Sequence, residues 1–125
     1  MAQFFYQFDG DLNFICTNYA IQVDEQTDFS VKLVQYCNQG GNPNITYALV
    51  NASTDEYFKH YPEVNGTYSS TADKIWFYGV PAGTWYLYIQ NDGNGGCSSI
   101  SLNGYVTSDS GNVVEFDGYC GRLNL

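Results

Sequence analysis

A single histidine and a set of scattered carboxylates are the groups in this chain that could carry out catalysis. A nucleophilic mechanism would need His60, in EYFKHYP, beside a serine or cysteine and an orienting acid. The sequence contains neither a G-x-S-x-G nor an H-E-x-x-H element. Paired carboxylates could hydrolyse glycosides, but sequence spacing does not set the distance between them. We therefore expect His60 to be a surface residue and the protein not to be an enzyme.

Two acidic and amide-rich stretches could bind a hard cation. Asp9 and Asp11 flank Gly10 in the first, and Asn91 and Asp92 are adjacent in the second. Calcium takes six or more oxygen ligands from such loops, yet neither stretch matches the twelve-residue EF-hand pattern. Asp and Asn also favour turns because their side chains hydrogen-bond to nearby backbone groups. We expect no bound cofactor and keep these four residues as the calcium candidates.

The chain contains four widely separated cysteines: Cys16, Cys37, Cys97 and Cys120. They form no C-x-x-C pair, so a zinc knuckle or a thioredoxin-type redox site is not expected. An even number of cysteines in a chain rich in Asn, Gly and Tyr predicts two disulfides and an oxidising, extracellular or cell-surface setting. Three pairings are possible, and the cysteines could instead bridge subunits or remain buried thiols. The start MAQFFYQFDGD shows no secretory signal peptide.

Residues 74–90 could form a binding surface, because side chains alternate between the two faces of a strand. The turn GVPAG predicts that KIWFYG and TWYLYIQ pair as a hairpin. One face would then be core, with Ile75, Phe77, Trp85, Leu87 and Ile89. The other face would be an aromatic platform of Lys74, Trp76, Tyr78, Tyr86 and Tyr88. Such a platform suits sugar rings or protein contacts, unless another segment covers it or the tyrosines merely suit strands.

Eight or nine short strands would position these groups. Asp9-Gly10-Asp11 predicts a hairpin turn between the first two strands, the second of which could be bent. No segment keeps a helical period, and no apolar run approaches the length of a membrane span. We predict an all-β fold with one domain over 1–125, a single antiparallel β-sandwich or jelly roll. The expected strands are 3–8, 12–23, 29–37, 45–50, 74–79, 84–90, 99–106 and 112–119, with 56–61 a weaker candidate.

Charge and composition narrow the possible partners. The chain has 13 acidic and 4 basic residues, a net charge of −9. This balance argues against nucleic acid, which needs clustered Lys and Arg, and against anionic membranes. It is compatible with cationic proteins, cations or neutral sugars, although acidity can also serve solubility alone. The 12 Tyr, 8 Phe and 2 Trp favour strands and contact surfaces over helices.

Several strand-like runs between 29 and 106 resemble a known family. FSVKLVQYC, ITYALVNAS, FYGVPAGTWYLYIQND and SISLNGYV are similar to the strands of small bacterial secreted domains of the pre-peptidase C-terminal type. That family carries a V-PAGTYYL-V-N pattern after a loop. The resemblance implies a sandwich and an extracellular setting. The four cysteines and the Phe- and Tyr-rich start depart from the family, so no functional residue is carried over.

These observations favour a non-enzymatic extracellular or cell-surface module that acts by protein contact. Assembly or adhesion, including self-association, fits the aromatic strands, and FFYQF at 4–8 could pair with the sheet edge of another subunit. The alternative is a carbohydrate-binding module that uses the same platform for glycans. Neither a nucleic-acid partner nor membrane insertion is expected.

Overall fold

A computed structural model describes residues 1–71, 74–93 and 96–125, and for Lys74 the backbone alone. Strands dominate and form two antiparallel sheets, which confirms the predicted all-β sandwich. None of the described segments is a helix long and apolar enough to cross a bilayer. The strands are β1 (Ala2–Asp11), β2 (Phe14–Val23), β3 (Thr27–Cys37), β4 (Asn44–Asn51), β5 (Glu63–Asn65), β6 (Lys74–Val80), β7 (Gly83–Asn91), β8 (Ser99–Ser108) and β9 (Asn112–Glu115).

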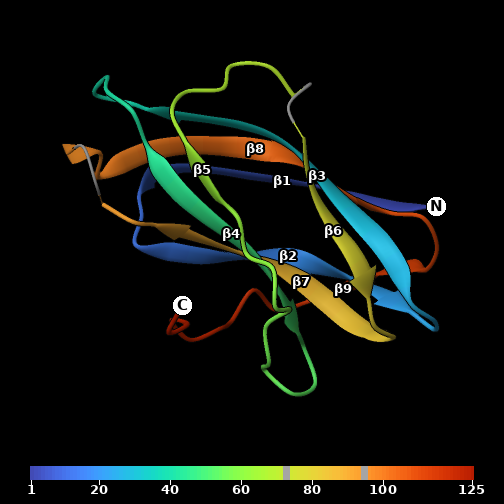
Figure 1. Cartoon of the computed structure of the whole chain (residues 1–125). Coiled ribbons are helices and arrows are strands. Elements are labelled where there is room, and N and C mark those ends of the chain that lie inside the picture. Colours follow the sequence, from blue (N-terminus) through green and yellow to red (C-terminus); the bar gives the residue numbers. More distant parts are fainter. Residues whose placement is uncertain (72–73, 94–95) are drawn as a thin grey trace.

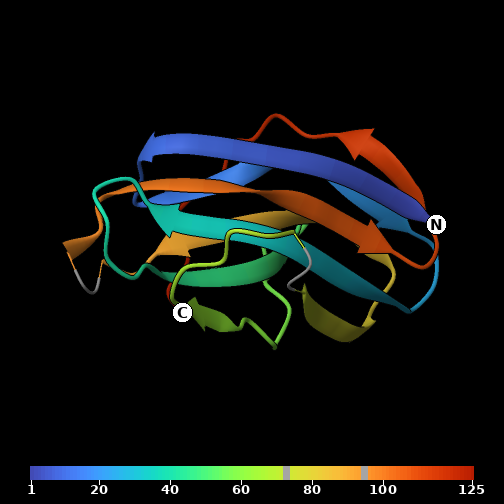
Figure 2. The same cartoon turned by 90° about the horizontal axis from the view of Figure 1, so that it is seen from above.

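The strand order is that of a jelly roll with one strand added. β1 pairs with β8, β2 with β7, β3 with β6 and β4 with β5, as in a long hairpin whose two halves pair and then roll up. One sheet therefore has the order β1-β8-β3-β6 and the other β5-β4-β7-β2-β9. Figures 1 and 2 show the two layers from the side and from above. Apart from β4 and β5, consecutive strands lie in opposite sheets.

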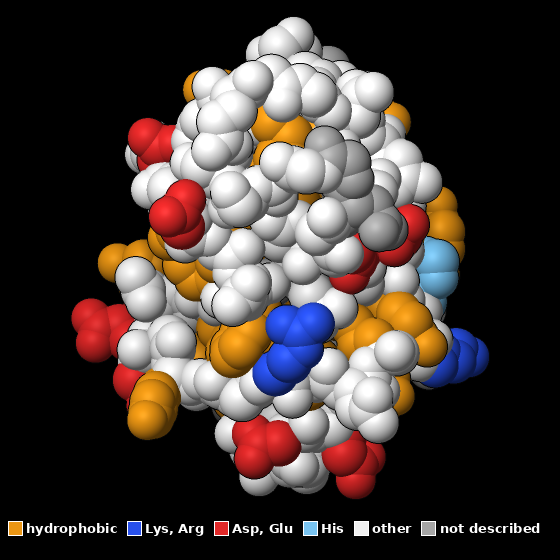
Figure 3. Space-filling view, turned by 90° about the vertical axis from the view of Figure 1, so that its left-hand side faces the viewer, with side chains coloured by type: hydrophobic (Ala, Val, Ile, Leu, Met, Phe, Trp, Pro, Cys, Tyr) orange, Lys and Arg blue, Asp and Glu red, His pale blue; other side chains and the backbone are white. Residues whose placement is uncertain are grey.

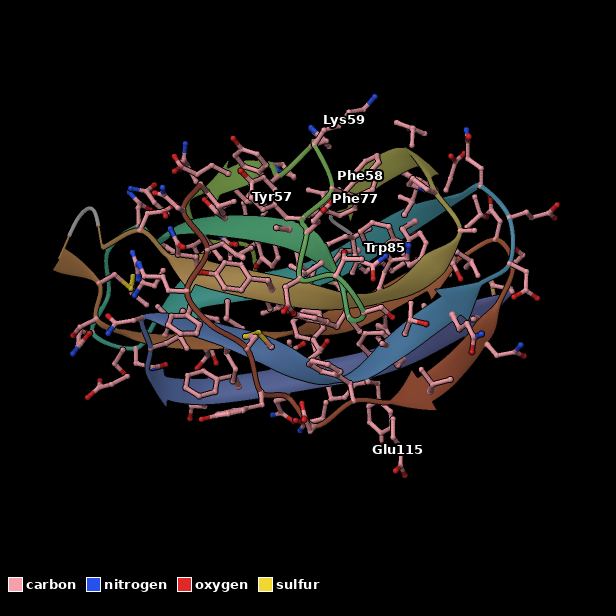
Figure 4. All side chains as sticks on the ribbon, turned by 90° about the horizontal axis from the view of Figure 1, so that it is seen from below. Tyr57, Phe58, Lys59, Phe77, Trp85 and Glu115 are labelled. Carbon is pink, nitrogen blue, oxygen red and sulfur yellow. A yellow bond between two sulfur atoms is a disulfide. The ribbon has the colours of Figure 1, made fainter. Side chains whose placement is uncertain are left out.

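Alternate side chains of both sheets point inward and form one apolar core. Phe77 on β6 and Trp85 and Leu87 on β7 are buried there, as the two-residue period predicts. Phe58, from the segment between β4 and β5, packs edge-on against Phe77 and Trp85 with ring centroids 6.5 and 6.3 Å apart. Figure 4 shows these three side chains gathered at one place between the sheets.

Both predicted hairpins are wrong, because the strands concerned lie in opposite sheets. β6 pairs with β3, whereas β7 pairs with β2 and β4. The chain crosses from one sheet to the other between them, and the indole N–H of Trp85 donates to the Pro81 carbonyl at 2.9 Å, which anchors this connection. Likewise, β1 continues through Asp9, Gly10 and Asp11 and pairs with β8, so that the crossing to β2 comes later.

The two places where the sequence predicted weak or bent strands are irregular in different ways. The weaker strand candidate at 56–61 is wrong: it makes a single bridge, Val50 with Tyr57, and the short strand β5 follows it. The predicted bend in the second strand is confirmed as a bulge, since four steps from Cys16 to Ala20 on β2 face two steps on β7. The hydroxyl of Thr17, inside the bulge, accepts a hydrogen bond from the Leu87 N–H at 3.1 Å.

Two disulfides use all four cysteines, as predicted. Cys37 pairs with Cys97 and Cys16 with Cys120, with Cα separations of 5.7 and 6.4 Å. Such bonds are typical of proteins in an oxidising environment. The second bond links residues 104 positions apart. In the chain-entropy model, closing a loop of that size stabilises the fold by about 4–5 kcal/mol.

The Cys16–Cys120 bond holds residues 116–125, here called the strap, against the outer face of the five-stranded sheet. Phe116 stacks on Tyr86 with ring centroids 4.3 Å apart and planes 13° from parallel. The Leu123 N–H donates to the Tyr88 hydroxyl at 3.1 Å. Figure 4 shows the strap running across this sheet. The strap thus covers side chains that alternation alone would leave in water.

Removing the cross-link of the strap should lower the pKa of Tyr86. Burial, helped by repulsion from Asp55, Tyr88 and Asp117, raises this pKa from 10.0 to about 12. The folded protein therefore keeps a proton that the unfolded chain releases. The resulting stabilisation is present below pH 10.0 and is lost as the pH rises through about 12. In Cys16→Ser/Cys120→Ser we expect the pKa of Tyr86 to move toward 10.0, measured by tyrosinate absorbance against a Tyr86→Phe background.

The matched control is Cys37→Ser/Cys97→Ser, which removes the disulfide that does not hold the strap. It should leave the titration of Tyr86 unchanged while lowering the free energy of unfolding. An unchanged Tyr86 titration in Cys16→Ser/Cys120→Ser would show that the strap does not depend on its disulfide.

Candidate functional site

The outer face of the four-stranded sheet carries exposed aromatic side chains. The exposed fraction is 65 % for Tyr78, 47 % for Phe5, 41 % for Tyr36 and 39 % for Trp76. Tyr105 is partly exposed and lies opposite Phe5 in the β1–β8 pairing. We call these five side chains the aromatic face. Figure 2 looks down on the sheet that carries it, with β1, β8 and β3 side by side.

The aromatic side chains form two ring pairs near opposite edges of this sheet. On β6, the Trp76 and Tyr78 rings are 5.9 Å apart and within 6° of parallel. Across β1 and β8, the Phe5 and Tyr105 rings are 5.3 Å apart and tilted by 58°. Strands are spaced about 4.8 Å apart, so the columns of Tyr105 and Trp76 are separated by roughly 10 Å.

Hydroxyl and amide groups lie in the same rows as these rings. Gln3, Thr107, Ser30 and Trp76 follow one another across β1, β8, β3 and β6. In the neighbouring row, Lys32 is paired with Tyr105. Ser30 is buried, so the face combines flat aromatic rings with the accessible polar groups of Gln3, Thr107 and Lys32.

An anionic group is fixed at one end of the face. The Asp9 carboxylate accepts hydrogen bonds from the Asn38 amide at 2.9 Å and the Ser101 hydroxyl at 2.7 Å. These two hydrogen bonds hold the pKa of Asp9 below its ordinary value. Asp9 therefore remains ionised at neutral pH.

The predicted platform does not exist as one surface. Trp76 and Tyr78 lie on the outer face of the four-stranded sheet, but Tyr86 and Tyr88 face outward from the other sheet. There the strap covers them, leaving Tyr86 3 % and Tyr88 0 % exposed. The side chain of Lys74 lies outside the described residues. The prediction failed because it assigned β6 and β7 to one sheet.

Three members of the aromatic face were missed: Phe5, Tyr36 and Tyr105. The alternation in 3–8, 29–37 and 99–106 does assign them to the non-core side. What the sequence lacked was any indication that these three strands and β6 belong to one sheet.

The structure does not bring the four calcium candidates together. Asp11 and Asn91 line the same hollow at one end of the sandwich, but the buried Asn91 amide already donates to the carbonyls of Leu12 and Cys97. Asp92 instead accepts from Thr46 and Gln90, and Asp9 lies on the sheet face. Over residues 1–71, 74–93 and 96–125, no three His, Cys, Asp or Glu side chains gather closely enough to hold a metal ion.

His60 is exposed, as predicted for a surface residue. Its ring lies 5.8 Å from that of Phe77, in an edge-on contact. We assign His60 no role beyond this contact at the edge of the core.

One end of the sandwich differs from the aromatic face. In the end view of Figure 3, acidic side chains lie around the periphery and hydrophobic side chains form separate small groups.

Comparison of the chain with protein-family models finds no match, and comparison with curated proteins finds none either. The geometry of the aromatic face therefore carries the functional argument.

Truncation of the two tryptophans should change the free energy of unfolding to very different extents. Trp85 is 5 % exposed and packs in the core, so Trp85→Ala should lower the free energy of unfolding by about 3–5 kcal/mol. Trp76 is 39 % exposed, and Trp76→Ala should change it by less than about 1 kcal/mol. Urea unfolding followed by circular dichroism measures both. Equal destabilisation by the two variants would contradict the assignment of Trp76 to a contact surface.

Proposed function

We propose that this chain is a non-enzymatic extracellular or cell-surface module that acts by protein contact, and that the aromatic face is its contact surface. The observation that carries the proposal is the exposure of Phe5, Tyr36, Trp76 and Tyr78 on one sheet face. Exposed aromatic side chains that gather on one face mark interaction sites, because water solvates them poorly. Tyr and Trp are also the residues that most often dominate the energy of protein interfaces.

The size of the sheet supports this proposal. Four strands spaced about 4.8 Å apart and about ten residues long cover a flat area of roughly 600 Å². The side chains add relief, so the accessible surface is larger than this projection. A standard protein interface takes about 800 Å² from each partner. The face is thus large enough to form most of one interface, either in assembly of subunits or in adhesion.

Self-association tests the proposal on the chain alone. Sedimentation velocity should show concentration-dependent association of the wild type by roughly 100 μM, a range typical of weak contacts. Trp76→Ala/Tyr78→Ala should weaken this association at least about tenfold, because it removes both rings of the exposed pair.

The matched control is Tyr57→Ala/Tyr61→Ala. It removes a second exposed ring pair, 5.5 Å apart, that lies outside the sheets. The control should associate like the wild type. A monomeric wild type at the highest concentration, or equal weakening by both double variants, would contradict self-association through the aromatic face and leave adhesion to another protein as its role.

A second candidate function, carbohydrate binding, is favoured by the parallel Trp76 and Tyr78 rings. The C–H faces of a sugar ring pack flat on aromatic rings because the hydrogens meet the negative ring face. Thr107 in the same row, with the exposed Gln3 amide, could accept from or donate to sugar hydroxyls. A neutral glycan suits this face better than an acidic one, given the net charge of −9.

A glycan array with the wild type separates the two functions. If the face binds sugars, Trp76→Ala should abolish the signal while Tyr57→Ala, with the same exposed fraction of 39 %, preserves it. A blank array with an associating protein leaves protein contact as the function. A signal that persists in Trp76→Ala would place the glycan elsewhere.

A further inference from the structure

The two sheets are unequal on one side of the sandwich. The five-stranded sheet ends in β2 and then β9, whereas the four-stranded sheet ends in β1. β1 lies over β2, where the Phe4 and Tyr19 rings are 6.1 Å apart. By strand count β9 extends one position beyond β1, although the two strands also approach each other, and Figure 2 shows both at this margin of the molecule.

The side of β9 that faces inward is exposed. Val113 is paired with Ile21 and Glu115 with Tyr19, and paired residues point to the same face. Ile21 belongs to the core and is 0 % exposed, so this is the inner face. Nevertheless Val113 is 39 % and Tyr19 43 % exposed, and Glu115 is exposed too. Figure 4 shows Glu115 projecting at this margin, far from the Phe58 cluster.

β1 offers a backbone edge at the same place. Its ten residues pair with β8, and the described backbone hydrogen bonds join it to no strand on its other side. In an antiparallel pair, the N–H and C=O groups of alternate residues point away from the partner strand and remain available. A cavity of about 130 Å³ opens beside this edge, lined in part by Tyr6, Phe8, Ile15 and Tyr19. An added strand would find both hydrogen-bond partners and a side-chain pocket here.

The negative charge of this margin indicates what kind of strand would bind there. The strands β1, β2 and β9 contain no Lys or Arg, but they contain Asp11 and Glu115, and Asp9, whose carboxylate is held toward β8 by Ser101. Asp117 follows directly after β9. A second copy of this chain would bring a further net charge of −9 to the margin, which is unfavourable. A basic strand would bring opposite charges together instead.

We infer that this margin, here called the open edge, binds an extended basic peptide segment of another protein as a fifth strand beside β1. Apolar side chains of the peptide cover Val113 and Tyr19 on the inner side, and a Lys or Arg pairs with Glu115. Backbone hydrogen bonds to β1 supply affinity, and the cavity supplies side-chain selectivity. This site uses the edge of the sheet rather than its aromatic face, so it does not depend on the function proposed above.

Synthetic peptides test the site on the intact protein. The probe is an N-acetylated, C-amidated octapeptide of alternating Val and Lys, compared with its Val and Glu counterpart by calorimetry. We expect one-to-one binding of the basic peptide and at least about tenfold weaker binding of the acidic one. Two further versions are N-methylated on all Val or on all Lys. One of them should lose at least about tenfold in affinity, because it lacks the N–H groups that face β1.

Protein variants locate the peptide. Glu115→Gln should weaken binding about threefold to tenfold, whereas Glu56→Gln, an equal charge change at an exposed residue outside the sheets, should not. Amide hydrogen exchange should slow along β1 when the peptide is bound. These readouts separate the site from the aromatic face, since Trp76→Ala/Tyr78→Ala should leave peptide binding unchanged.

Three outcomes would overturn the inference. The first is no binding of the basic peptide, or equal binding of both N-methylated versions. The second is equal weakening by Glu115→Gln and Glu56→Gln. The third is slowed exchange along β1 in the protein alone at high concentration, which would assign the edge to a second copy of this chain.

Discussion

The Cys16–Cys120 disulfide determines which surfaces of this jelly roll are available. It holds the strap across the five-stranded sheet, where Phe116 stacks on Tyr86 and the Leu123 N–H donates a hydrogen bond to the Tyr88 hydroxyl. A two-layer sandwich has two outer faces, and both are built here from strands with aromatic outward positions. Because the strap buries the aromatic side chains on one outer face, those that remain exposed on an outer face lie on the other, while Tyr19 is exposed at the margin of the inner side.

The aromatic face belongs to the four-stranded sheet alone, whereas the proposed open edge combines β1 of that sheet with β2 and β9 of the other. The four-stranded sheet presents its aromatic face and, through β1, its open edge. The five-stranded sheet carries the strap on its outer face and extends β9 beyond β1. Acidic groups such as Asp9 and Glu115 lie around these surfaces rather than at the centre of the aromatic face. The five-stranded sheet also contributes Tyr19, Val113 and Glu115 to the proposed open edge, so that site draws on both sheets.

The alternation of side chains predicted much of the fold and little of the site. Phe77, Trp85 and Leu87 point inward as expected, since the two-residue period depends only on each strand. Whether β6 and β7 pair or cross the core depends on partners far away in sequence, which a turn such as GVPAG does not reveal. Because β6 and β7 lie in opposite sheets, Tyr86 and Tyr88 lie on the other side of the molecule from Trp76 and Tyr78. The cysteine count predicted two disulfides, but it did not predict the Cys16–Cys120 pairing that holds the strap.

The central claim is that one aromatic outer face is covered and the other is open. Nitration of the folded protein by tetranitromethane, located by mass spectrometry of peptides, measures this directly. The account predicts rapid modification of Tyr78, comparable with Tyr119 at 81 % exposed, and protection of Tyr86 and Tyr88 until the protein unfolds. Modification of Tyr86 or Tyr88 as fast as Tyr78 in the oxidised, folded protein would contradict it.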